Sequence, residues 1–490
     1  MKKILYFSLI AAAFAGCQPE FNDAVNETGF YDNGEADFST YVSVGNSLTA
    51  GYTDGAVFRF GQTNSFPNIM ATQFAHAGGG EFTQPLVDDN IGGLLAGGQQ
   101  IADARRVIQY SADGSPTPVI LDGTPTTDIT NIVAGPYNNM GVPGAKSYHL
   151  LVNGYGNIGN FPAAANPYYI RMASTPDASV IQDAVAMNPT FFTLFIGSND
   201  ILGYATSGGT GIDQTGNQNV ASYGSNDITD PTVFAGVYNQ LLQALTANGA
   251  KGAVASLPEV KAVPFLTTVP YNAIPLDAAT AAYLNQSYAQ YNGAIQQFRL
   301  LNAITEEEAA QRTISFSAGQ NAVVIMDEDL TDLSAYSVPN LRQATAADFI
   351  PLPVSSVLGT LADPNDPTSV IGVGVPLNDG QVLTETEAIT VDNARMAYNA
   401  TIEALASNYD LAFVDIYDLI TQLSTTGVQY DGGTLTSTYA TGGAFSLDGV
   451  HPTARGYAVV ANTFIHAIND KYGSSVPDVN PGTYPTLYVE

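Results

Sequence analysis

The chain has 490 residues, of which 45 are acidic and 15 basic, so its formal net charge is −30. This excess of negative charge argues against a nucleic-acid-binding protein and against electrostatic attachment to anionic lipid. The only cysteine is Cys17, so no intramolecular disulfide forms, and with four histidines a Cys/His zinc site is not expected. The apolar fraction of 45% is ample for a core in one large α/β domain or in two or three ordinary ones.

Residues 1–16 have the pattern of an export signal. Lys2 and Lys3 precede an apolar run over residues 4–13, and small residues lead to Cys17. The run is too short for a permanent transmembrane helix. The segment resembles a bacterial lipoprotein signal with its lipobox. This resemblance implies an exported protein with an acylated Cys17 at its mature N-terminus, held at a membrane, and we expect the outer membrane. An ordinary secretory signal with an incidental cysteine is the alternative.

Residues 17–37 are polar and acidic, which is typical of a tether, and residues 38–472 alternate strands with helices. This alternation predicts an α/β fold with a mostly parallel sheet. The expected strands and helices of this core are listed here in chain order: strand 41–45, helix 64–77, strand 137–140, helix 176–187, strand 190–196, helix 231–248, strand 252–257, helix 385–407, strand 411–415 and helix 453–471. Residues 473–490 are expected to be a C-terminal tail.

Two long insertions interrupt the alternation, near residues 78–136 and 259–390. The first is rich in Gly, Pro, Thr and Asp and predicts a hairpin with strands 106–110 and 119–121, and the second predicts a helix near 277–303 and a β region at 313–326. The acidic stretches 327–329 and 363–366 offer carboxylates for Ca²⁺. Neither has a twelve-residue calcium-loop pattern, so we expect solvated turns.

Four segments follow predicted strand ends or open the last helix, and they carry the candidate chemistry. Ser47 follows the first strand, Gly144 the second and Asn199 the third, while Asp448 and His451 precede the last helix. A serine hydroxyl needs a base to become a nucleophile, and histidine is the usual one. Among the four histidines, His451 is favoured because a carboxylate three residues earlier can reach its Nδ1–H.

The other histidines are weaker candidates for the base. His149 follows Gly144 and is the second choice, whereas His76 and His466 are expected to be packing or surface residues.

The expected sheet order brings the strand-end residues together. In a doubly wound sheet of order 2-1-3-4-5, the first strand lies between the second and the third. Neighbouring strands are about 4.8 Å apart, so Ser47 is expected between Gly144 and Asn199. The backbone N–H groups of Ser47 and Gly144 and the side-chain amide of Asn199 would then form an oxyanion hole.

These segments together resemble the SGNH hydrolase superfamily, also called the GDSL esterase/lipase family. The matching blocks are residues 45–48 (Gly-Asn-Ser-Leu), Gly144, residues 197–200 (Gly-Ser-Asn-Asp) and residues 448–451 (Asp-Gly-Val-His). The resemblance implies a flavodoxin-like three-layer sandwich, an acyl-serine ester hydrolase and no metal or organic cofactor. Asn46 departs from the family, which usually has aspartate at this position.

The polar composition of the insertions, which we expect to wall the pocket, favours short-acyl esters or acetylated glycans. The alternatives are a long-chain lipase and a non-catalytic surface lipoprotein that binds glycan or protein. The absence of tryptophan disfavours a glycan platform, although 27 tyrosines keep that hypothesis open.

Overall fold

The computed structural model describes residues 30–110, 114–133 and 135–488. The expected signal, Cys17 and most of the acidic tether lie outside these residues, so export and lipid anchoring stay predictions. Residue 113, in the turn of the expected hairpin, also lies outside them. In the described part of the chain, no helix has both the length and the apolar character that crossing a membrane requires.

The centre of the fold is a five-stranded parallel sheet with the order β13-β8-β7-β1-β6. In chain order its strands are β1 (Tyr41–Gly45), β6 (Asn139–Gly141), β7 (Phe191–Phe195), β8 (Lys251–Ala255) and β13 (Ala412–Val414). Numbered along the chain, this is the order 2-1-3-4-5, so the predicted fold class and strand order are confirmed. All five residues of β1 and of β7 are buried, as central parallel strands require.

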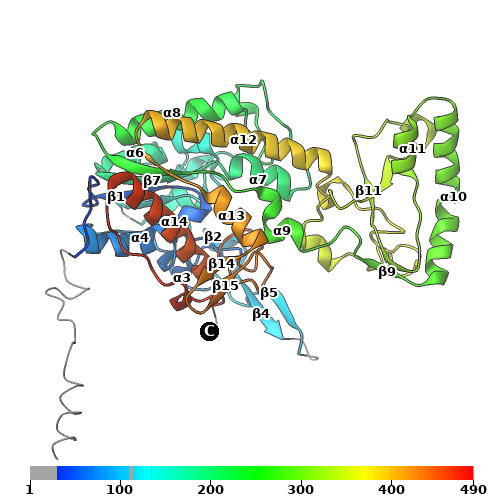
Figure 1. The fold of residues 1–490 in the computed structure, drawn as a ribbon, viewed down its shortest axis with the longest axis horizontal. Coiled ribbons are helices and arrows are strands. Elements are labelled where there is room, and N and C mark those ends of the chain that lie inside the picture. Colours follow the sequence, from blue (N-terminus) through cyan, green and yellow to red (C-terminus); the bar gives the residue numbers. More distant parts are fainter. Residues whose placement is uncertain (1–29, 111–113, 134, 489–490) are drawn as a thin grey trace, which may run out of the picture.

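Helices cover both faces of this sheet (Figure 1). One face carries α4 (Phe66–Phe74) and α14 (Ala454–Tyr472), which pack against each other. The other carries α6 (Val180–Ala186), α8 (Pro231–Thr246) and α12 (Glu385–Asn408). These helices and the sheet enclose one main hydrophobic core, giving the three layers that the resemblance implies.

Several short elements were not predicted from the sequence. Short helices are marginal alone and form where packing supports them, so a periodic pattern does not reveal them. They are α2 (Ser47–Ala50), α3 (Arg59–Thr63), α5 (Pro167–Met172), α7 (Asn199–Thr206), α9 (Pro264–Thr267), α13 (Ile416–Thr425) and the hairpin of β14 (Val428–Tyr430) with β15 (Gly433–Leu435). The segment after Gly144 forms a 3-10 helix, η2 (Ser147–Leu151).

The segment 78–136 contains two hairpins instead of the single one expected. The predicted hairpin is present as β4 (Arg106–Tyr110) with β5 (Pro116–Ile120), and a second pairs β2 (Leu94–Ala96) with β3 (Gln99–Ala102). Arg106 donates its backbone N–H to the Asp54 carbonyl at 2.7 Å, which joins this segment to the chain just after Ser47.

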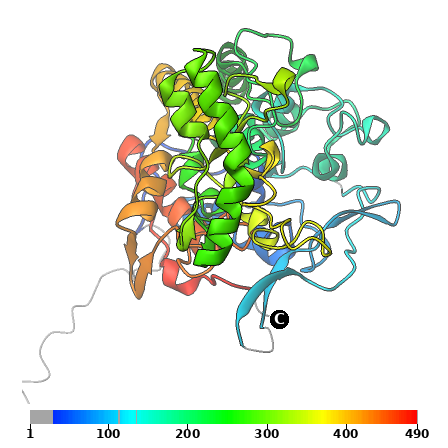
Figure 2. The same ribbon diagram turned by 90° about the vertical axis from the view of Figure 1, so that its right-hand side faces the viewer.

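The segment 259–390 has hydrophobic clusters of its own and stands to one side of the body (Figures 1 and 2). Besides the short α9, its α-helices are α10 (Ala278–Leu300) and α11 (Glu306–Arg312), and its strands are β9 (Ile274–Leu276), β10 (Gly319–Asn321), β11 (Val324–Met326) and β12 (Leu341–Gln343). Its two ends join it to the body. The first runs through η5 (Val260–Ala262), and the last leads into α12.

The described part of the C-terminal tail packs against the body. It contains η9 (Pro481–Thr483), and the Tyr488 ring lies edge-on to Phe58 at 5.0 Å between centroids. The stretch therefore covers part of the core near the segment that follows Ser47.

Candidate active site

Ser47 lies at the edge of the sheet, directly after the central strand β1. The strand ends at Gly45, and the side-chain oxygen of Asn46 accepts the N–H of Leu48 at 3.1 Å and caps helix α2. The helix cap is therefore the neutral amide of Asn46. Among the described residues, the buried Nδ2 of this amide has no hydrogen-bond partner. Ser47 is 7% exposed.

A chain of hydrogen bonds connects Ser47 to the loop before α14. Ser47 Oγ lies 2.9 Å from His451 Nε2, and His451 Nδ1 lies 2.9 Å from Asp448 Oδ2. The loop is held by the Ser446 N–H, which donates to the His451 carbonyl at 2.8 Å. The fold therefore brings the serine next to a histidine 404 positions away, with the aspartate behind it.

Asp448 is half-buried but remains ionised. One oxygen, Oδ1, accepts the N–H groups of Val450 and His451, both at 2.8 Å, and Oδ2 accepts the Gly55 N–H at 2.9 Å. Burial alone would raise the pKa of Asp448, but His451 and these N–H donors together hold it at about 2. The carboxylate therefore keeps the proton on His451 Nδ1 and leaves Nε2 free to accept one from Ser47.

Gly144 and Asn199 flank Ser47, because β6 and β7 pair with β1 on opposite sides. Asn199 donates one N–H to the Ala145 carbonyl at 2.9 Å and has a second N–H to offer a ligand. It also lines the same cavity as Ser47 and His451. Gly144 has a left-handed backbone conformation with φ 79°, which suits a residue without a side chain.

The remaining histidines do not join this chain. His149 accepts the Lys146 backbone N–H at 3.1 Å and stacks on the Tyr155 ring. Burial, followed by the Lys146 charge, lowers the pKa of His149 to about 4. His466 pairs with Asp478 on the surface, and His76 packs against Tyr31.

The turn that follows α2 supports the histidine loop and was missed from the sequence. The Tyr52 ring lies 4.5 Å from the His451 ring, centroid to centroid, and Gly55 binds Asp448. Asp54 accepts the Leu447 N–H at 3.0 Å and donates its own N–H to Ser446 Oγ at 2.9 Å. In the sequence these residues show only a Thr-Asp-Gly turn pattern, which does not reveal a partner almost 400 positions away.

Replacement of Asp54 by asparagine is expected to stabilise the protein at pH 8 but not at pH 4. Burial, and to a smaller extent the Asp448 charge, raises the pKa of Asp54 to about 7, although the Leu447 N–H opposes the shift. Because this pKa is higher in the folded than in the unfolded chain, the stability that Asp54 contributes is lost as the pH rises from about 4 to 7. Asparagine accepts the same hydrogen bond and tolerates the φ of 53°.

The gain in unfolding free energy at pH 8 is at most about 4 kcal/mol, and urea denaturation at both pH values measures it. The control is Asp103→Asn, which removes an exposed carboxylate nearby. Equal effects of Asp54→Asn at both pH values would contradict the assignment.

A narrow cavity of about 70 Å³ opens beside Ser47 and His451 and extends between the sheet and helices α13 and α14. Its apolar lining residues are Leu48, Phe66, Phe195, Ile201, Leu202, Leu257, Val260, Val263, Ile416, Ile420, Phe445, Val450, Tyr457 and Val460. The expectation of a wet pocket walled by the polar insertions is therefore wrong. Core elements form most of this wall, and the segment 259–390 contributes only its first residues, Val260 and Val263.

No protein-family model and no curated protein matches the chain. Among solved structures, the chain is similar to an extracellular lipase from Streptomyces rimosus, with 11% sequence identity and a TM-score of 0.31. The alignment covers 88% of this chain and 98% of the lipase. So distant a likeness carries no argument about function, which we base on the geometry of the site.

Proposed function

We propose that the protein hydrolyses carboxylic esters through an acyl-enzyme intermediate on Ser47. The observation that carries this proposal is the hydrogen-bonded chain Ser47–His451–Asp448 at the mouth of an apolar cavity. Nucleophile, base and orienting carboxylate are each within 2.9 Å of the next group, which is the spacing that proton transfer requires.

In the first half-reaction, Ser47 Oγ attacks the ester carbonyl carbon while His451 Nε2 takes the hydroxyl proton. The negative charge on the carbonyl oxygen is stabilised by the N–H groups of Ser47 and Gly144 and by the Asn199 amide. Asp448 stabilises the imidazolium, which then protonates the departing alkoxide and leaves the acyl group on Ser47. In the second half-reaction water attacks the acyl carbon, His451 takes its proton, and the acid is released as Ser47 regains a proton.

The cavity supports an aliphatic acyl chain as the specificity group, in place of the short acyl group favoured by the sequence. Burial of each methylene from water stabilises a complex by about 0.8 kcal/mol, provided that the wall is apolar. The wall beside Ser47 meets this condition, because the side chains of α13 and α14 that line it are mostly aliphatic.

A series of p-nitrophenyl esters from acetate to palmitate tests the proposal. We expect kcat/KM to rise by up to about fourfold per methylene until the cavity is filled, since 0.8 kcal/mol corresponds to that factor. Acetate as the best substrate would contradict the acyl-chain assignment. No hydrolysis of any member would contradict the proposed activity.

A substitution that fills the cavity gives a sharper comparison. Ile420→Phe places a larger side chain in the wall and is expected to abolish the preference for longer chains while activity on acetate remains. Leu423→Phe is the matched control, because Leu423 is buried on the same helix but does not line the cavity. If both variants lost the preference for longer acyl chains, the effect would come from altered packing of α13 and not from a filled cavity.

A further inference from the structure

Three carboxylates meet where the segment 259–390 returns to the body. Glu328 follows β11, Asp379 begins η8 (Asp379–Gln381), and Glu387 lies in the first turn of α12. One oxygen from each lies within 4.8 Å of the other two. Among the described residues, no ion pair involves any of the three, so their mutual repulsion is not offset by a basic side chain.

Glu387 is the buried member of this cluster, at 4% exposed. Its Oε2 accepts the N–H and the hydroxyl of Thr384 at 2.7 and 2.9 Å, which completes the capping box of α12. Its Oε1 is buried and has no hydrogen-bond partner among the described residues. The capping box accounts for Oε2, but among the described residues no donor accounts for the burial of Oε1.

The loop after α7 closes directly over this oxygen. A Cβ atom at Gly209 would lie 1.6 Å from Glu387 Oε1, so the backbone approaches the carboxylate as only a glycine allows. The cluster therefore has three carboxylates on one side and close backbone on the other.

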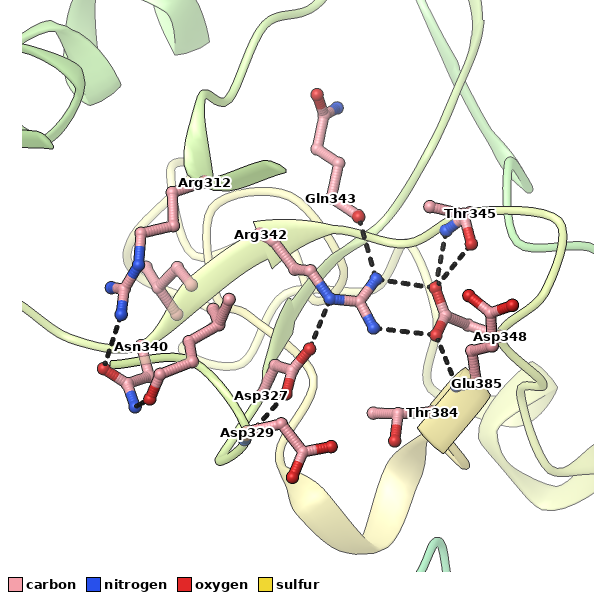
Figure 3. Close-up of polar contacts among 12 residues, drawn as sticks. Arg312, Asp327, Asp329, Asn340, Arg342, Gln343, Thr345, Asp348, Thr384 and Glu385 are labelled. Carbon is pink, nitrogen blue, oxygen red and sulfur yellow. Dashed lines mark hydrogen bonds and ion pairs between the residues drawn. The ribbon is translucent and has the colours of Figure 1, made fainter. Parts of the chain in front are cut away.

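A buried ion-pair network holds the segments that carry Glu328 and Glu387 (Figure 3). Arg342 donates to Asp327 and, through two bonds of 2.7 and 2.8 Å, to Asp348. Asp348 in turn accepts the Glu385 N–H at 3.0 Å. Asp327 precedes Glu328 and Glu385 is two residues before Glu387, so the network positions both of these carboxylate residues independently of the cluster. Asp327 is buried in this network, whereas Glu328 and Asp329 are exposed, so the expectation of a solvated turn holds for these two residues and is wrong for Asp327.

We propose that Glu328, Asp379 and Glu387 bind a Ca²⁺ ion that fastens the segment 259–390 to α12. Calcium takes six to eight oxygen ligands at about 2.3–2.6 Å, so two of its ligand oxygens are separated by at most about 5 Å, as the carboxylates are here. An all-oxygen set disfavours zinc, which prefers nitrogen and sulfur. A cavity of about 600 Å³, lined by Gly209, Glu328 and Asp379 among others, gives room for water ligands and a path of entry.

Calorimetric titration of chelator-treated protein with Ca²⁺ tests the proposal, with thermal unfolding as a second readout. We expect binding of one ion and a rise in Tm of about 2–4 °C at saturation. Neither readout depends on ester hydrolysis, so the result is distinct from that of the proposed function. No binding and no change in Tm up to about 10 mM Ca²⁺, above the weakest extracellular calcium sites, would overturn the proposal.

Substitutions distinguish two explanations of the cluster. In one, the carboxylates bind calcium; in the other, two of the carboxyl groups share a proton and bind no ion. Glu328→Gln, Asp379→Asn and Glu387→Gln are each expected to weaken Ca²⁺ binding at least about tenfold, while raising Tm without calcium because the repulsion is relieved. Glu387→Gln also keeps the capping box. Glu306→Gln is the matched control, because it removes an exposed carboxylate of the same segment outside the cluster. Unchanged calcium binding in the three variants, or Mg²⁺ binding as tight as that of Ca²⁺, would overturn the assignment.

Discussion

Replacement of Ser47 by alanine is expected to lower kcat for p-nitrophenyl ester hydrolysis by about 10⁶-fold and to leave the fold intact. The nucleophile and its base act as a unit, so loss of the hydroxyl removes the whole acyl-enzyme route. The cost in stability is small, because the change removes one hydrogen bond, that between Ser47 and His451, worth about 1 kcal/mol. Steady-state kinetics and circular dichroism measure the two effects separately.

Ser198 provides a matched control for this prediction. It lines the same cavity, and among the described residues its buried hydroxyl has no hydrogen-bond partner. Ser198→Ala therefore removes the same group from the same cavity without touching the histidine. We expect it to retain activity within a few-fold. If Ser47→Ala kept more than a few per cent of activity, or if Ser198→Ala were the inactive variant, the nucleophile would be wrongly assigned.

His451→Ala is expected to be as damaging as Ser47→Ala, because a serine without its base is not a nucleophile at neutral pH. The same substitution at His149 is the control. His149 is also a half-buried histidine in contact with tyrosine, but it binds backbone and lies outside the chain that leads to Ser47. His149→Ala should lower Tm through lost packing while kcat stays near that of the wild type. Comparable loss of kcat in both variants would contradict the assignment of His451.

The acid side of the pH profile follows from the same contacts. Asp448, with its pKa at about 2, stays ionised wherever the protein is folded and active, so it does not limit the rate. The acid side of the activity profile is therefore expected to show no ionisation that belongs to Asp448. An ionisation assigned to Asp448, for example by a profile that changes on Asp448→Asn, would contradict this expectation.

The sequence by itself determined the order of the sheet and the placement of the residues at its edge. Buried strands such as β7 appear in the sequence as continuous apolar runs. Parallel strands end at the same edge of the sheet, so the residues that follow successive strands lie together at that edge. Ser47 and Asn199 could be placed in this way. The Asp448–His451 pair could be recognised because its members are only three residues apart in a turn before a helix.

Only the tertiary structure decided the polarity of the cavity and the partners of the turn after Ser47. The insertions are polar, but the cavity wall beside Ser47 is formed mostly by the core. A periodic sequence pattern shows which face of a helix is buried, but it does not show which residues that face contacts. The same limit hid the contact of Gly55 with Asp448 and the meeting of Glu328 with Glu387. Such contacts join residues far apart in sequence, and they exist only because the folded chain brings those segments together.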